Sequence, residues 1–136
     1  MIAQLLWKAQ KIGCTAEEDY IYIYQRKGGI MSSRQVQGHF DWLEALYRRF
    51  FFCKDKPELF AFTSETRAVY FRALNDLFLL PDLHRAASKQ QLQQAKKQYA
   101  QLDGKTKTER INWAVFQISP SLDHWMVQKV RSRRRT

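Results

Sequence analysis

The chain has 136 residues, of which 45% are apolar and 14% aromatic, so it is long and apolar enough to bury the core of one domain. Five glycines and three prolines are too few for a turn-rich fold of many strands, and they favour long helices. No apolar run approaches the roughly 20 residues of a bilayer-spanning helix, so we expect no membrane partner.

The net charge of +10 is concentrated in the second part of the chain. Residues 1–82 hold 11 Lys and Arg against 10 Asp and Glu, whereas residues 83–136 hold 12 against 3. A positive excess confined to one part of a chain points to a polyanionic partner, because a surface that only keeps a protein soluble would spread its charge.

The first predicted element is a helix over residues 2–12, where apolar side chains recur at helical spacing and Gly13 supplies the stop. Thr15 and Glu18 then have the spacing of a capping box, which starts a second helix.

The segment after this box, Tyr20–Tyr24, alternates as a strand does and is rich in residues that strands prefer. We favour a helix, because the box and the pair Gly28-Gly29 bracket a segment of helical length. The alternative is one short strand pair of Tyr20–Tyr24 with Leu59–Phe62.

The clearest helix start is Ser32, which can cap the helix while Gln35 reaches back to it. This helix should end near Phe52, and a further one should run from Thr63, or the next residue, to Pro81. The apolar stripes of the two helices are Val36, Phe40, Leu43, Tyr47 and Phe50, and then Ala68, Phe71, Leu74, Leu77 and Phe78.

Residues 83–102 have a narrow apolar stripe, which indicates a helix covered on one side only. Asp103-Gly104 ends it, and Thr106 and Glu109 form a second capping box that opens the next helix. Ser119-Pro120 starts the last helix. The three stripes are Leu92, Ala95, Tyr99 and Leu102, then Ile111, Ala114, Val115 and Ile118, and finally Leu122, Trp125, Met126 and Val130.

These elements predict an all-α fold, a single-domain bundle or orthogonal array of about six or seven helices over residues 1–136. Within it, residues 1–82 form a near-neutral, aromatic-rich scaffold half. Residues 83–130 form a basic helical half, and residues 131–136 a basic tail.

No catalytic or metal-binding motif is visible in the sequence. His39, His84 and His124 have no ligand neighbour at helical spacing, and Cys14 and Cys53 are isolated thiols. We interpret the cysteines as small buried residues in a reducing cytoplasm, with a disulfide or metal site as the alternative. Phosphate-binding glycine loops and nucleophile turns are absent. We therefore expect a cytoplasmic protein that is not an enzyme, with no cofactor, no metal and no small-molecule substrate.

The basic residues of the second half are the candidate nucleic-acid site. On one continuous helix, Arg85, Lys89 and Lys96 would share a flank of the apolar stripe. Lys105, Lys107 and Arg110 surround a helix start, where free backbone N–H groups also attract phosphate. The full predicted set is Arg85, Lys89, Lys96, Lys97, Lys105, Lys107, Arg110, Lys129, Arg131, Arg133, Arg134 and Arg135.

Four aromatic residues are candidates for other contacts. Trp42 and Trp113 lie off the predicted apolar stripes, so they are expected to be exposed and able to stack on unpaired bases. The run that contains Phe51 and Phe52 covers more than one helix face, so part of it is expected to contact another element or another chain.

Together these features predict an accessory protein that contacts the phosphate backbone of DNA or RNA without catalysis. The alternative is a small helical interaction subunit or adaptor of a larger complex, with a nucleoprotein complex included, which binds a protein partner or self-associates.

Overall fold

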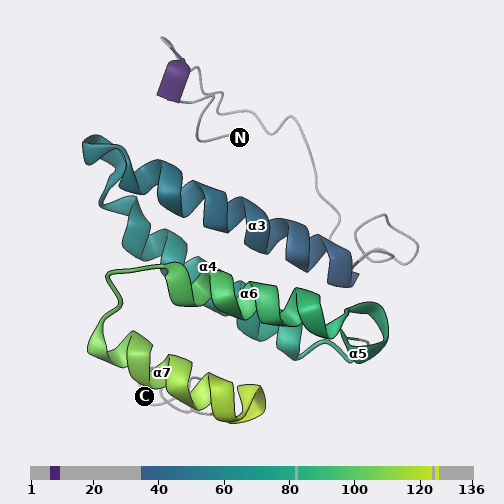
Figure 1. Cartoon of the computed structure of the whole chain (residues 1–136). Coiled ribbons are helices and arrows are strands. Elements are labelled where there is room, and N and C mark those ends of the chain that lie inside the picture. The colour runs from purple at the N-terminus through teal and green to yellow at the C-terminus, as the bar shows by residue number, and fades with distance from the viewer. Residues whose placement is uncertain (1–6, 10–34, 82, 124, 126–136) are drawn as a thin grey trace, which may run out of the picture.

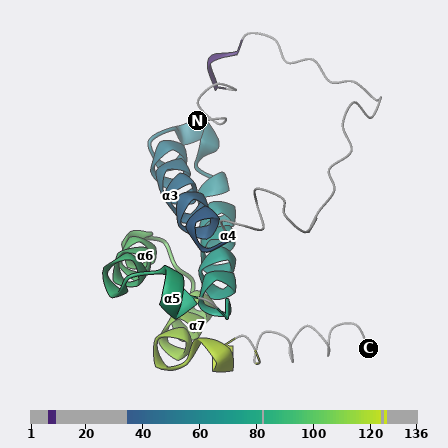
Figure 2. The same cartoon turned by 90° about the vertical axis from the view of Figure 1, so that its right-hand side faces the viewer.

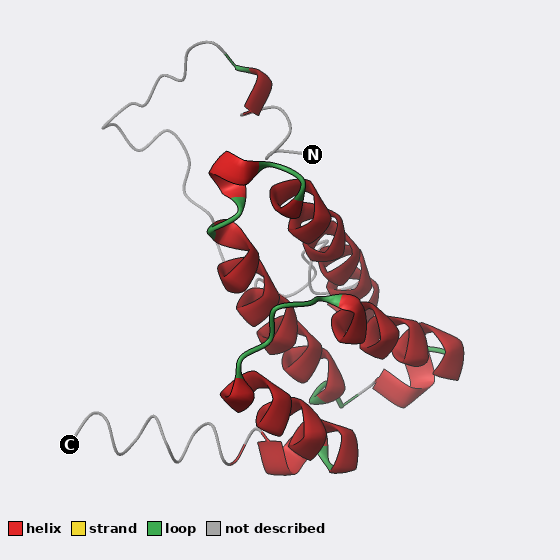
Figure 3. Cartoon of the chain, turned by 60° about the vertical axis from the view of Figure 1, so that its left-hand side comes forward, coloured by secondary structure: helices red, strands yellow, loops and turns green. Residues whose placement is uncertain are grey.

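The computed structural model describes residues 7–9, 35–81, 83–123 and 125 of the chain (Figure 1). Within these ranges the regular elements are all helices and none is a strand, which confirms the all-α prediction (Figure 3). No helix in this part of the chain has the length and hydrophobicity that a bilayer crossing requires. The elements are α3 (Gln35–Lys54), the 3₁₀ turn η1 (Pro57–Leu59), α4 (Phe62–Phe78), α5 (Leu83–Ala86), α6 (Lys89–Gln101) and α7 (Lys107–Ile118).

Some sequence predictions fall outside the described ranges. They are most of the helix over residues 2–12, the Thr15 capping box, the Tyr20–Tyr24 element, the helix start at Ser32, and everything beyond Trp125.

The helices α3 and α4 form a hairpin and lie side by side (Figures 1 and 2). The predicted stripe of α3 faces this contact, with Leu43 and Phe50 almost fully buried. The helix ends at Lys54, two residues later than Phe52. Pro57 then opens η1, where its missing N–H costs nothing because the first position of a helix has no partner for it.

The helix α4 begins at Phe62, so the strand proposed for Leu59–Phe62 is wrong. The Thr63 backbone N–H and hydroxyl both donate to the Phe60 carbonyl, at 3.1 and 2.7 Å, which closes a helical turn there. The stripe prediction also fails at Ala68, which is exposed, while its neighbour Arg67 is buried. Arg67 is turned inward by an ion pair with α7, and this pair sets which face of α4 is covered.

Residues 83–102 do not form one continuous helix. The short α5 ends at Ala86, and Ser88 starts α6. The Ser88 hydroxyl accepts from the Gln91 backbone N–H, and the Gln91 side chain accepts from the Ser88 N–H, a complete capping box. The chain therefore turns between α5 and α6, and their side chains do not share one helical face.

The narrow stripe of α6 is buried as predicted, with Tyr99 and Leu102 inaccessible to solvent. The helix lies against both α3 and α4 (Figure 2). Hydrogen bonds with α3 and α4 fix it there. They join the Tyr47 hydroxyl to Gln101 at 2.6 Å, Gln98 to the Glu44 carboxylate at 2.6 Å, and the Tyr70 hydroxyl to the Ala95 carbonyl at 2.9 Å.

Gly104 follows α6 with a φ of +73°, a conformation that glycine adopts without strain, and α7 begins at Lys107. The predicted capping box of α7 is present in both directions between Thr106 and Glu109. In Figures 1 and 2 this helix lies on the side of α4 and α6 away from α3.

The buried face of α7 differs from the prediction. Glu109, Trp113 and Phe116, at spacings of four and three, face the interior, whereas Ile111 and Ile118 are exposed. The ion pair with Arg67 holds the Glu109 carboxylate inward, and Trp113 and Phe116 pack on the same side of α7 against the aromatic rings of α4 and α6.

A cluster of aromatic rings forms the contact between α4, α6 and α7. Phe116 is fully buried, and its ring centroid lies between 5.2 and 5.7 Å from those of its three neighbours, Phe71, Phe78 and Trp113. Tyr99 joins the cluster through Phe71 at 5.1 Å and Trp113 at 4.8 Å.

The helix predicted to start at Ser119-Pro120 is present in its first turn. Ser119 is extended, residues 120–123 are helical, and the Leu122 N–H donates to the Ser119 carbonyl at 3.2 Å. The apolar side chains Leu122 and Trp125, expected on a core-facing stripe, are exposed.

Candidate nucleic-acid interface

Seven of the twelve predicted cationic residues lie in the described ranges, and the other five, Lys129, Arg131, Arg133, Arg134 and Arg135, lie outside them. Five of the seven are exposed and form no ion pair with another residue of the described part. These five define what we call the open cation set: Arg85, Lys89, Lys97, Lys107 and Arg110.

The break at Ser88 changes how this set is arranged. Arg85 belongs to α5 and Lys89 to α6, so the single flank predicted for Arg85, Lys89 and Lys96 does not exist. On α6, Lys97 points away from the side that carries Tyr99, and Lys89 stands in the first turn.

Lys96 is only partly exposed, and it contacts the core. Its ammonium lies over two core rings, 4.9 Å from the centroid of Phe78 and 5.7 Å from that of Phe116. Such cation–π contacts are favourable where the cation is partly desolvated. We therefore assign Lys96 to the junction of α4, α6 and α7 and not to the surface.

Lys105 is similarly occupied. Its ammonium donates to the carbonyls of Leu102 and Ala100 near the end of α6 and lies 4.9 Å from the Tyr99 ring centroid. Burial, and then the nearby Arg67 guanidinium, lowers the pKa of Lys105. This lysine closes the end of α6 and contributes less to the outer surface than the sequence predicted.

The start of α7 is also less open to phosphate than predicted. The Thr106 hydroxyl accepts from the Glu109 N–H at 3.2 Å, and the Glu109 carboxylate accepts from the Thr106 N–H at 2.6 Å. Two of the backbone donors at this helix start are therefore satisfied internally. Lys107 and Arg110 remain beside it as exposed charges.

The three carboxylates of the second half are all turned inward or toward the first half. Asp103 pairs with Lys54 of α3 at 2.5 Å, and Glu109 pairs with Arg67 of α4 at 2.9 Å. Asp123 is fully buried. Cations of the first half thus neutralise two acids of the second half. Neither Asp103 nor Glu109 forms an ion pair with the open cation set among the described residues.

The two candidate stacking residues have different environments. Trp42 on α3 is 52% exposed, as predicted. Trp113 is half-buried in the aromatic cluster, with its ring at 16° to that of Phe116, so its prediction as an exposed residue is wrong. The inward turn of Glu109, four residues earlier, places it there.

Phe51 and Phe52 are half-buried. The Phe51 ring makes edge-to-face contacts with Tyr47 and Phe50, with ring centroids 5.0 and 5.4 Å apart. The Lys54 ammonium lies 5.9 Å from the Phe51 ring centroid. Phe51 therefore has its main contacts within α3, and neither residue is among the strongly exposed aromatic side chains.

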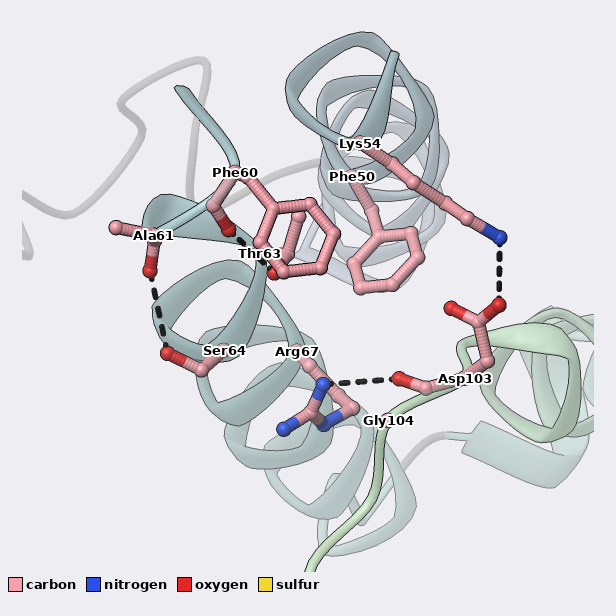
Figure 4. A pocket seen from close by; sticks show the side chains of 9 residues that line it. All are labelled: Phe50, Lys54, Phe60, Ala61, Thr63, Ser64, Arg67, Asp103 and Gly104. Atoms are coloured by element: carbon pink, nitrogen blue, oxygen red, sulfur yellow. Dashed lines mark hydrogen bonds and ion pairs between the residues drawn. The ribbon is translucent and has the colours of Figure 1, made fainter. Parts of the chain in front are cut away.

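A depression of about 240 Å³ opens between the hairpin and the turn after α6 (Figure 4). The rings of Phe50 and Phe60 line one side of it. Its polar groups satisfy one another, since Lys54 donates to the Asp103 carboxylate and Arg67 donates to the Asp103 carbonyl at 2.9 Å. Hydrogen bonding from Lys54 lowers the pKa of Asp103. These side chains stabilise the turn rather than presenting an acid–base pair.

The described part of the chain holds no group of three or more His, Cys, Asp or Glu that could bind a metal ion. Cys53 is a buried free thiol there. No protein-family model matches the chain, and no curated protein or solved structure matches it.

Proposed function

We propose that this protein binds nucleic acid through the phosphate backbone, without catalysis, and that the open cation set provides the contacts within the described residues. The observation that carries the proposal is that Asp103 and Glu109 pair with Lys54 and Arg67 of the first half, while Asp123 is buried. Because Asp103 and Glu109 neutralise Lys54 and Arg67, they do not neutralise the open cation set. Cations that face solvent without local compensation repel one another, and a polyanion relieves this repulsion.

The contacts expected from this arrangement are electrostatic and independent of base sequence. Lysine and arginine on three separate short helices can neutralise phosphates, and phosphate contacts carry no base-sequence information. Binding by such contacts releases counterions, so affinity falls steeply with salt. Neutralising about five phosphates gives a log–log salt slope on duplex DNA of about −4.5.

The test is fluorescence anisotropy with duplex DNA, single-stranded DNA and RNA over a salt series. The double variant Lys89→Gln/Lys97→Gln removes two members of the open cation set. Its control, Arg49→Gln/Arg72→Gln, removes two exposed cations of the first half, so the net charge changes equally. We expect the first variant to weaken binding and to reduce the slope by about 2, and the control to change both much less.

Deletion of residues 131–136 tests the tail separately, and we expect weaker binding with the fold intact. Three results would overturn the proposal. They are no binding at low salt, binding that does not respond to salt, and equal losses in the two double variants.

A further inference from the structure

The outer face of α7 is apolar and uncovered. Ile111, Ala114 and Ile118 follow one another at spacings of three and four, so they lie on one side of the helix. Ile118 is 82% exposed and Ile111 59% exposed, while Val115 at the edge of this face is half-buried. We call these four residues the α7 outer stripe.

The stripe is exposed because the opposite face of α7 packs against the core. Glu109, Trp113 and Phe116 fix α7 against α4 and α6, and the helix cannot bury both faces against them. A helix that is apolar on two sides is normally covered on both. Large exposed apolar side chains in a row indicate an interaction surface rather than scattered surface residues.

The distribution of charge along α7 indicates what covers the stripe. The cations Lys107 and Arg110 flank its first turn, whereas the last turn holds no basic residue and ends in peptide carbonyls that carry the negative end of the helix dipole. Two copies of α7 packed antiparallel would place the cations of each beside the carbonyl end of the other. Like charges would then stand at opposite ends of a helix about 18 Å long.

The centre of the stripe suits the same arrangement. Ala114 lies midway between Ile111 and Ile118, so a two-fold axis at this point would bring the two Ala114 side chains together and let the helices approach closely. Each Ile111 would meet the Ile118 of the other copy. A two-fold contact of this kind is self-complementary, which is the commonest geometry of homodimers.

We infer that the α7 outer stripe is a homodimer contact in which two copies of this chain pack antiparallel about Ala114. This surface corresponds to the interaction-subunit alternative drawn from the sequence, with a second copy as the partner. The contact would involve Lys107 and Arg110 of the open cation set, so it is tested without nucleic acid. A short contact of this size gives a weak dimer that forms with rising protein concentration.

The test is sedimentation velocity on the full chain over a wide concentration range, without nucleic acid. The variant Ile118→Glu places a charge on the stripe. Its control, Gln117→Glu, makes the same charge change on the neighbouring residue, which is exposed but off the stripe. We expect the wild type and Gln117→Glu to dimerise alike, and Ile118→Glu to associate about tenfold more weakly or not at all.

Cross-linking tests the geometry by a second route. In a Cys14→Ser background, Ala114→Cys should form a disulfide-linked dimer on mild oxidation, because the two thiols would meet at the axis. Gln117→Cys, on the same helix, should form no disulfide link between the two copies. Circular dichroism verifies that each variant keeps its helices.

Two results would overturn the inference. One is a wild-type chain that stays monomeric at all concentrations, with Ala114→Cys linking no better than Gln117→Cys. The other is equal association of Ile118→Glu and Gln117→Glu. High salt separates this contact from the proposed function, since an apolar contact persists there while phosphate binding is lost.

Discussion

The Arg67 guanidinium and the Glu109 carboxylate join α4 to the first turn of α7 by two hydrogen bonds, at 2.9 and 3.1 Å. The pair is largely withdrawn from solvent, with the side chains 5% and 22% exposed. The same carboxylate completes the capping box with Thr106, and the same guanidinium donates to the Asp103 carbonyl. One residue pair therefore holds the turn, the helix start and the rotation of α7.

Replacing Glu109 by glutamine should destabilise the fold. Glutamine can preserve the capping box, but the Arg67 charge would be left buried without its counterion. Loss of one partner of such a pair costs about 3 kcal/mol of unfolding free energy. Urea denaturation measures this. Glu65→Gln, which removes an exposed acid from the first turn of α4, should cost under ~0.5 kcal/mol. Similar effects of the two substitutions would contradict the assigned role of Glu109.

Acid should unfold the protein by protonating these carboxylates. Burial alone would raise the pKa of Glu109, but hydrogen bonds from Arg67 and Thr106 outweigh it and hold the pKa below its ordinary value of 4.5. A hydrogen bond from Arg48, and a second from Gln98, lower the pKa of Glu44. A group with a lowered folded pKa stabilises the fold above its unfolded pKa, and this stability is lost as pH falls through the folded pKa. We expect the urea midpoint to be steady near neutrality and to drop below about pH 4.3, with a smaller drop in Glu109→Gln.

Lys96 and Lys97 are neighbours with opposite expected roles. Lys96→Gln removes a cation that lies over the Phe78 and Phe116 rings, so it should lower stability and leave nucleic-acid affinity nearly unchanged. Lys97→Gln removes an exposed cation, so it should leave stability unchanged and reduce the salt slope by about 1. Thermal denaturation and anisotropy on both variants check this. The opposite pattern would mean that Lys96 is the surface contact.

Phe116→Ala should be among the most damaging substitutions. The ring is fully buried among Phe71, Phe78 and Trp113, and its removal leaves a cavity where three helices meet. We expect a loss of about 3–5 kcal/mol in unfolding free energy. Ile118→Ala on the same helix removes an exposed side chain and should change the monomer's stability by less than about 0.5 kcal/mol. Equal losses would show that α7 packs by its other face.

Ser88→Ala should loosen the start of α6. The hydroxyl accepts from the Gln91 N–H at 3.2 Å, and loss of such a cap costs about 1 kcal/mol. Ser88→Asn keeps an acceptor at this position and should retain most of the stability. Urea denaturation measures the loss. If Ser88→Ala had the same unfolding free energy as the wild type, packing alone would hold the break between α5 and α6.

Local signals in the sequence predicted local structure well. The Thr106 and Glu109 capping box, the stop at Gly104 and the stripe of α3 all follow from spacing within a few residues. The break at Ser88 was also readable, because Ser88 and Gln91 have the spacing of a capping box. The apolar stripe of residues 83–102 alone predicts one continuous helix, and this prediction places Arg85 on the same helix as Lys89.

The rotation of α7 could not be predicted from its own residues. Ile111, Ala114 and Ile118 make a stripe as regular as Trp113 and Phe116, and hydrophobicity does not choose between them. The buried face carries Glu109, whose partner Arg67 lies 42 residues away in sequence, and the two rings that pack on Phe71 and Phe78. The same long-range packing leaves Trp113 half-buried, and Ala68 lies on the exposed side of α4.

The contacts that fasten the second half to the hairpin determine how its binding activity can be mapped. Lys54 to Asp103, Glu44 to Gln98, Tyr47 to Gln101 and Arg67 to Glu109 all cross between the halves. A fragment that begins at Leu83 would retain the cations but release Glu109 and Asp103 from their partners and uncover Tyr99. Its affinity for nucleic acid would then be that of an unfolded polycation, so truncation would misassign the binding residues, and single substitutions in the intact chain are the sound way to locate them.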